Sequence, residues 1–294
     1  MNKMLALGMI LMFLASCDGC GGSESLNKTL TYQNIVILSD LSSRVDNKTS
    51  KDIDQIHKIV QYFENECVKP GEKIGDKSSI CFSTFSDKSI AVIDIGKIKN
   101  LGEKQQYINS TGTYKKNGLA YNIDDFEQKV KSTYENTRNQ GLDLISILTE
   151  KLENEPMVKE NTYLTDGVDT TFVNYDNHIY IFTDGYLEYQ NKDTNKQFFF
   201  GSLEIEKVRK FCNANNIDII KALETNSSLC LPTSESKGNK LVNLHVLETH
   251  ERDKSDKLQT YKHPKGQRDN EILEAVWRKW AADSGFKSFE WKKY

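Results

Sequence analysis

The chain has 294 residues, of which 37% are hydrophobic and 28% are charged, and its formal net charge is -3 at pH 7. This balance is that of a soluble globular chain with one large or two small domains, and it lacks the basic field that favours nucleic acid. Only 4 prolines and 17 glycines argue against a disordered or fibrous chain. We therefore predict no nucleic-acid partner and a folded domain in water.

The first residues differ from the rest. Lys3 gives a positive start, and residues 4–15 are almost wholly apolar. Such a run is too short for a comfortable transmembrane helix and is typical of a signal-peptide core. It ends in Leu-Ala-Ser-Cys at residues 14–17, which resembles the lipobox of bacterial lipoproteins. An ordinary cleaved signal peptide, or a cytoplasmic protein with an apolar start, would be the alternatives.

The lipobox resemblance implies that residues 1–16 are removed and that Cys17 carries lipid. Two or more acyl chains anchor stably, because each buried methylene contributes about 0.8 kcal/mol. Small and polar residues follow Cys17, so residues 17–33 are predicted to be a flexible tether. We expect a lipid-anchored protein of the bacterial cell envelope, with a soluble domain outside the cytoplasm that spans residues 34–294.

Four further cysteines lie in the predicted domain, at Cys67, Cys81, Cys212 and Cys230. Disulfides are permitted in an oxidising compartment, and the pairs Cys67–Cys81 and Cys212–Cys230 would each close a short loop. Four cysteines allow three connectivities, and buried free thiols are the alternative. The cysteines and histidines show no convincing zinc-ligand spacing.

The first half of the domain begins with an apolar run at residues 34–39, which is typical of a strand buried on both faces. Helical periodicity follows at residues 50–66. Residues 79–85 and 89–95 are predicted to form a hairpin, and residues 107–120 are polar and irregular.

In the second half we predict helices, strands and loops from the same patterns. Helices are expected at residues 123–138, 142–152, 203–213 and 270–283, strands at 178–183, 241–248 and 287–291, and loops at 153–177 and 250–267. The alternation of strands and helices predicts an α/β fold with a mostly parallel sheet and helices on both faces.

Two of the apolar strands end in acidic turns. Ser-Asp-Leu-Ser-Ser occupies residues 39–43, and Thr-Asp-Gly occupies residues 183–185. Ligands bind at the carboxyl ends of strands in open α/β sheets, so Asp40 and Asp184 converge if their strands are parallel neighbours. Two adjacent carboxylates need a counter-charge, for which a divalent cation is the usual solution.

This arrangement resembles the von Willebrand factor A domain, mostly in the order of elements over residues 32–294. That family has an early strand ending in Asp-x-Ser-x-Ser, a later threonine, and a strand ending in Thr-Asp-Gly. The resemblance implies an A-like fold with a metal-dependent adhesion site for Mg²⁺ or another divalent cation. Asp40, Ser42 and Asp184 match the liganding positions.

The chain also departs from the family's pattern. Arg44 stands where the third motif position has serine, and Leu142 stands in the threonine's place. Arg44 is a candidate counter-charge, because a bidentate guanidinium contact to Asp40 or Asp184 would replace the metal with an internal ion pair.

The preferred functional hypothesis is a protein-binding module. An A-like domain on a lipid tether would present Asp40, Ser42, Asp184 and Arg44 to another envelope protein. A metal-assisted hydrolase using Asp40 and Asp184 is the alternative, but no base or nucleophile is evident and no catalytic residue is assigned. A structural envelope protein with a vestigial site is the third hypothesis.

Overall fold

The computed structural model describes residues 27–42, 49–72, 76–137, 141–155, 157–165, 169–189, 197–255 and 257–294. The predicted lipidation site Cys17, the tether residue Cys20 and the predicted counter-charge Arg44 lie outside these ranges.

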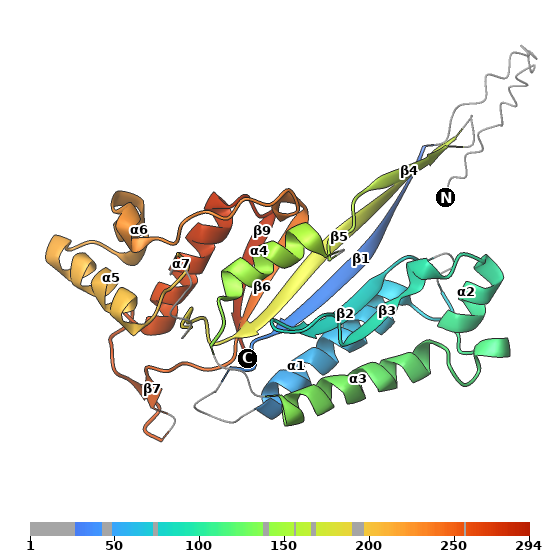
Figure 1. The fold of residues 1–294 in the computed structure, drawn as a ribbon, viewed down its shortest axis with the longest axis horizontal. Coiled ribbons are helices and arrows are strands. Elements are labelled where there is room, and N and C mark those ends of the chain that lie inside the picture. Colours follow the sequence, from blue (N-terminus) through green and yellow to red (C-terminus); the bar gives the residue numbers. More distant parts are fainter. Residues whose placement is uncertain are drawn as a thin grey trace, which may run out of the picture.

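The described residues form a seven-stranded sheet in the order β3-β2-β1-β5-β6-β9, with β4 also paired to β5 (Figure 1). The pairs β1–β2, β1–β5, β5–β6 and β6–β9 are parallel, whereas β2–β3 and β4–β5 are antiparallel. The strands are β1 Lys28–Ser39, β2 Ser79–Thr84, β3 Ala91–Asp94, β4 Thr162–Thr165, β5 Thr170–Thr183, β6 Val242–Glu248 and β9 Ser288–Lys293. The predicted α/β class with a mostly parallel sheet is therefore confirmed.

Helices cover both faces of this sheet. The two faces are read directly from β1, where Ile35 and Ile37 enter one apolar cluster and Val36 and Leu38 enter the other. The first cluster is covered by α1, α2 and α3, and the second by α4, α5, α6 and α7 (Figure 1). Burial on both faces explains why the central strands are continuous apolar runs instead of alternating ones.

The α-helices are α1 Thr49–Tyr62, α2 Leu101–Ile108, α3 Leu119–Asn136, α4 Leu144–Asn154, α5 Ser202–Asn215, α6 Ile219–Thr225 and α7 Asp269–Asp283. The single-turn elements are the π-helix Phe63–Val68 and the 3₁₀ turns Ile95–Lys97, Gly112–Tyr114, Ser227–Leu229 and Asn239–Leu241. A small hairpin pairs β7 Lys254–Ser255 with β8 Thr260–Tyr261. In the ranges described, every helix is too short or too polar to cross a bilayer.

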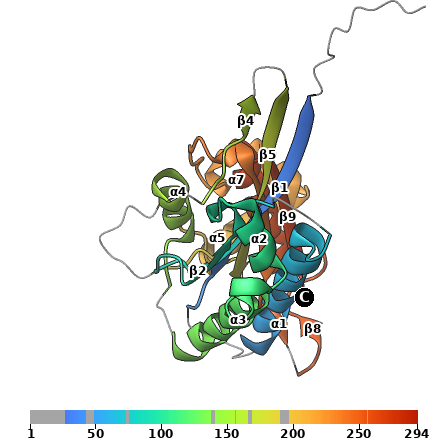
Figure 2. The same ribbon diagram turned by 90° about the vertical axis from the view of Figure 1, so that its right-hand side faces the viewer.

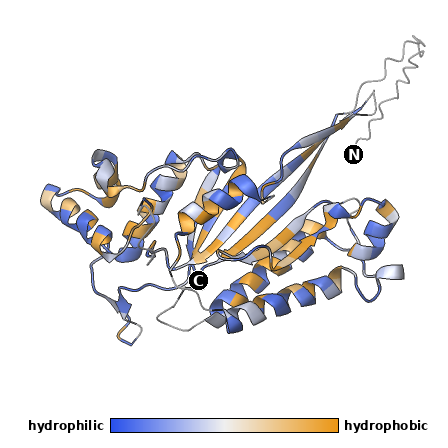
Figure 3. Cartoon of the chain, in the orientation of Figure 1, coloured by the Kyte–Doolittle hydropathy of each residue, from blue (hydrophilic) through white to orange (hydrophobic). Residues whose placement is uncertain are grey.

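An arm projects from the sheet where β1, β4 and β5 extend beyond the helices (Figure 2). Here Lys28 to Gln33 pair in parallel with Thr171 to Asp176. The strand β1 begins at Lys28 and not at residue 34, so the predicted tether overlaps it. Likewise the predicted loop at residues 153–177 contains β4 and the first half of β5. The arm mixes polar and apolar residues (Figure 3) and contains no continuous apolar run like those of the central strands.

Two short helices were not predicted from the sequence. The helix α2 is capped by Asn100, whose side chain accepts a hydrogen bond from the Glu103 N–H, and α6 is capped in the same way by Asp218. Side-chain caps satisfy otherwise unpaired N–H groups, and they contribute most where a helix is too short for its periodicity to be recognised.

The predicted disulfides are not formed. Among the residues that the structure describes, no disulfide joins any of Cys67, Cys81, Cys212 and Cys230. Cys67 lies in the cluster under α1, whereas Cys81 follows Ile80 in β2 and points to the opposite face of the sheet. The Cys81 thiol instead lies 3.2 Å from the Ser89 hydroxyl. Short separation in sequence therefore did not place these two sulfurs together, because the sheet lies between them.

Candidate functional site

The two acidic turns meet at one edge of the sheet. The strands β1 and β5 lie side by side and parallel, with Ser39 opposite Phe182 (Figure 1). One further backbone hydrogen bond extends the ladder, from the Asp40 N–H to the Phe182 carbonyl at 2.8 Å. The register therefore delivers Asp40 and Asp184 to the same carboxyl edge, as predicted.

The Asp40 carboxylate is held below the surface by neutral donors. Asp40 as a whole residue is 8% exposed to solvent. The Ser42 N–H donates to Oδ1 at 3.0 Å, and the Thr183 hydroxyl donates to Oδ2 at 3.2 Å. Burial, and next the charge of Asp184, raises the pKa of Asp40 above its ordinary value. Asp40 is therefore a carboxyl group whose ionised form is costly in this position.

Asp184 has a cation of its own, Arg252. The Arg252 Nε donates to Asp184 Oδ2 at 2.7 Å, and its NH1 donates to Glu188 Oε2 at 2.6 Å. The guanidinium also lies 3.9 Å from the centre of the Tyr186 ring. A fork of donors over an aromatic face suits arginine and not lysine. Arg252 thus supplies a positive charge at Asp184, where a metal ion or Arg44 was predicted from the sequence.

The turn that carries Asp184 is fixed from the other side by α7. The Trp277 indole N–H donates to the Gly185 carbonyl at 2.8 Å. Gly185 has φ +85°, and a Cβ there would lie 2.5 Å from the Trp291 ring. Both the left-handed backbone and the close ring demand glycine at this position. The aspartate is therefore presented by a turn with little freedom.

Polar contacts continue from this turn to α5 and α7. The Tyr186 hydroxyl donates to Asp269 Oδ2 at 2.7 Å, and Arg209 NH2 donates to Asp269 Oδ1 at 2.5 Å. Burial, followed by the hydrogen bond to Asp269, raises the pKa of Tyr186. The strand edge is therefore part of a connected network of side chains.

A third acid at this edge, Glu248, was missed by the sequence analysis. It ends β6 and lies opposite Thr183 of β5. Its side chain is 1% exposed, and Oε2 accepts a hydrogen bond from the Trp291 indole at 2.9 Å. Oε1 has no hydrogen-bond partner among the described residues, and burial raises the pKa of Glu248 to about 7. The signal was present, since the predicted strand at residues 241–248 ends in this glutamate.

The residues present fit a divalent cation poorly. The Asp184 oxygens accept hydrogen bonds from the Tyr186 N–H at 3.1 Å and from Arg252. Arg252 therefore already provides the positive charge at Asp184 that a metal ion would otherwise provide. In the segment that resembles the family's threonine loop, Asp143 caps α4 by accepting a hydrogen bond from the Ser146 N–H at 3.1 Å. The leucine before it, Leu142, offers no oxygen ligand from its side chain.

A separate cavity of about 760 Å³ lies at the opposite end of the sheet, between the end of α4 and the start of β6. Its lining includes Glu153, Glu155, Glu160 and Glu235, but neither Asp40 nor Asp184. The cavity and the acidic strand edge are thus different parts of the molecule.

Comparison with known proteins gave no assignment: no protein-family model matches the chain, and no curated protein matches it. Function is therefore argued from the residues and their geometry.

Proposed function

We propose that this chain is a lipid-anchored protein of the bacterial envelope whose von Willebrand factor A-like domain binds another envelope protein. The binding surface is formed by Ser42, Asp184, Glu188 and Arg252, with Asp40 beneath them, and is called the strand-end surface below. The observation that carries this proposal is the parallel pairing of β1 with β5, which places these groups at the edge where α/β sheets bind their ligands.

In this proposal Arg252 both holds the acidic side chains of the surface together and contacts the partner. Arg252 pairs with both Asp184 and Glu188, so the strand-end surface is held together by this cation without a divalent ion. Arg252 is 31% exposed on its side chain, which leaves part of the guanidinium free to contact a partner. Arginine is among the residues that contribute most to protein interfaces. The partner is accordingly a protein that approaches this edge.

Anchoring through Cys17 can be tested by substitution. We expect the Cys17→Ser protein to keep residues 1–16 and to carry no lipid, because in bacterial lipoproteins the lipid is attached before the signal is removed. The wild-type protein should begin at Cys17, carry acyl chains and enter the detergent phase. The reason is that each acyl methylene contributes about 0.8 kcal/mol to membrane binding. Fractionation with mass spectrometry of the N-terminal peptide measures this, and Cys20→Ser is the matched control. An acylated N-terminal peptide in Cys17→Ser, or one without lipid in the wild type, would contradict the assignment.

Partner binding can be tested with Arg252→Ala. Intact membranes carrying the tagged protein are cross-linked, and the amount of each co-purified protein is compared between variants. We expect at least one partner to fall by about tenfold or more with Arg252→Ala, as loss of a central interface arginine does. Arg278→Ala, a surface arginine of α7 with a side chain that is 51% exposed, should change nothing.

The same experiment in excess chelator separates the internal cation from a metal ion. Capture that persists in chelator agrees with Arg252 as the counter-charge, whereas loss of capture would return the site to a divalent cation at Asp40 and Ser42. Partners captured equally by wild type, Arg252→Ala and Arg278→Ala would refute the strand-end surface as the binding site.

A further inference from the structure

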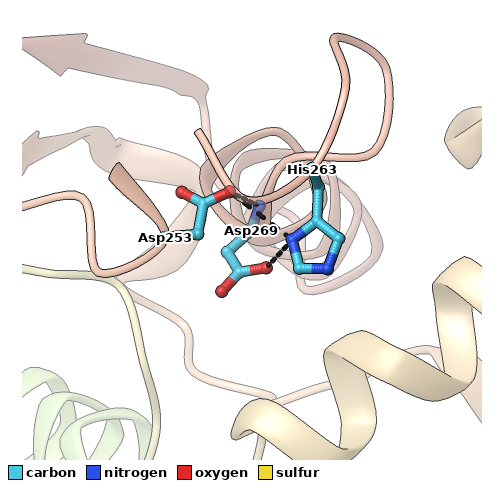
Figure 4. A group of neighbouring side chains, drawn as sticks. All are labelled: Asp253, His263 and Asp269. Carbon is cyan, nitrogen blue, oxygen red and sulfur yellow. Dashed lines mark hydrogen bonds and ion pairs between the residues drawn. The ribbon is translucent and has the colours of Figure 1, made fainter. Parts of the chain in front are cut away.

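A second group of titratable side chains lies beside the strand-end surface. Asp253 precedes β7, His263 follows β8, and Asp269 is the first residue of α7 (Figure 4). One nitrogen or oxygen from each of the three lies within 4.8 Å of the others. The small hairpin and the start of α7 thus bring two carboxylates and one imidazole together.

The contacts inside this group are not those of a completed hydrogen-bond network. His263 Nδ1 is buried without a hydrogen-bond partner in the described part of the chain, and it lies 3.8 Å from Asp253 Oδ2 and 3.6 Å from Asp269 Oδ1. Both separations are too long for a hydrogen bond. Figure 4 shows the ring nitrogen facing both carboxylates. The nitrogen therefore points at two acceptors that it does not reach.

The charge of Asp253 is also incompletely balanced. Its side chain is 1% exposed, and Oδ1 has no hydrogen-bond partner. Oδ2 accepts a hydrogen bond from the Asp269 N–H at 3.2 Å. Asp269 Oδ1, which lies 3.6 Å from His263 Nδ1, also accepts a hydrogen bond from Arg209 NH2 at 2.5 Å, and a carboxylate oxygen keeps a further lone pair for an ion. Among the described residues, the only cationic group in ion-pair range of Asp253 is His263, when protonated. A buried carboxylate of this kind calls for a nearby cation.

We propose that Asp253, His263 and Asp269 bind one divalent transition-metal ion. Ligand atoms held about 2.0–2.2 Å from a tetrahedral zinc ion lie about 3.4 Å from one another. The separations of 3.6 and 3.8 Å from His263 Nδ1 are close to this value. An imidazole ligand suits zinc, copper, iron or nickel better than magnesium, calcium or manganese, so zinc is the ion expected here.

The proposed site has a structural consequence for the strand-end surface, although it does not depend on the proposed function. Arg252 is the residue before Asp253. Asp269 also accepts the hydrogen bond from Tyr186, the ring on which Arg252 lies. A metal ion here would fasten the β7–β8 hairpin to α7 and so fix the segment that carries Arg252. Three protein ligands leave one position of a tetrahedral ion for water. The side chain of His263 is 30% exposed, so water can reach the site.

Zinc titration of the full-length protein in detergent tests the proposal. Calorimetry should give one Zn²⁺ per chain. His263→Gln and Asp253→Asn should weaken binding by more than about 100-fold, beyond the cost of losing an outer-shell partner. The matched control is His57→Gln, which removes a half-exposed histidine that also lies beside a carboxylate, Glu127 at 2.6 Å. Asp40→Asn should leave zinc binding unchanged.

Ligand identity has a second readout. Co²⁺ bound at the site should give visible absorption bands that His263→Gln removes, while circular dichroism shows the variant to be folded. No zinc binding to the wild type would overturn the proposal. Zinc binding that His263→Gln leaves intact would overturn it too, since the ion would then be held elsewhere.

Discussion

Trp277→Ala is expected to lower the free energy of unfolding by about 3–5 kcal/mol, the range for removing a fully buried tryptophan. Trp277 is 0% exposed and packs edge-on against Trp280, with ring centres 5.5 Å apart. The substitution also leaves the Gly185 carbonyl without its hydrogen bond from the indole. The loss should therefore loosen the turn that presents Asp184 as well as empty part of the core.

A pair of tryptophan-to-phenylalanine variants separates the hydrogen bond from the packing. The Trp280 indole N–H is buried without a partner, and Trp280 is 1% exposed. Trp280→Phe therefore removes ring volume alone, whereas Trp277→Phe also removes the hydrogen bond to Gly185. Urea unfolding should show Trp277→Phe to be less stable than Trp280→Phe by about 1–3 kcal/mol. Equal losses would mean that the hydrogen bond contributes nothing to stability.

Glu248→Gln is expected to stabilise the protein above pH 7. Burial raises the pKa of Glu248 from 4.5 to about 7, because its ionised form is poorly solvated. A group whose pKa is higher in the folded state contributes stability that is fully present below the unfolded pKa and is lost as pH rises through the folded pKa. Between pH 4.5 and 7 this loss amounts to about 3 kcal/mol, an order-of-magnitude value from linkage.

Glutamine cannot ionise, so the variant should show little of this pH dependence. Its side-chain oxygen can still accept the hydrogen bond from Trp291. We expect urea unfolding at pH 8 to give a gain of about 2–3 kcal/mol over the wild type, and at pH 4 little or no gain. The difference in free energy of unfolding between wild type and Glu248→Gln should change between pH 4.5 and 7. If it stays constant, the ionised form of Glu248 is not destabilised in the folded protein.

The neighbouring strand supplies a control of opposite sign. Burial acts to raise the pKa of Glu290, but hydrogen bonds from Lys292 and His245 outweigh it and leave that pKa lowered. Stability from such a carboxylate is present above the unfolded pKa and is lost as pH falls. Glu290→Gln should therefore gain nothing at pH 8, and its 43% exposed side chain makes any loss small.

Within the sheet, the sequence was informative where burial dictates composition. The runs at residues 34–39, 178–183 and 241–248 lie in β1, β5 and β6, because strands covered on both faces must be apolar throughout. The same reasoning fails in the arm. There β4 and the first residues of β1 and β5 are held by backbone hydrogen bonds between polar and apolar residues that are mostly exposed or only partly buried. Backbone pairing leaves no mark on hydropathy.

At the candidate site, too, local burial patterns determined some features and the tertiary structure determined others. By itself the sequence determined that Asp40 and Asp184 end two apolar strands, and parallel neighbours then deliver them to one edge. Only the tertiary structure decided which cation meets Asp184 among the described residues. That residue is Arg252, which lies 68 positions away in the chain. Strand character follows from local burial patterns, whereas the pairing of charges depends on how distant loops fold back over the sheet, and no local pattern encodes that path.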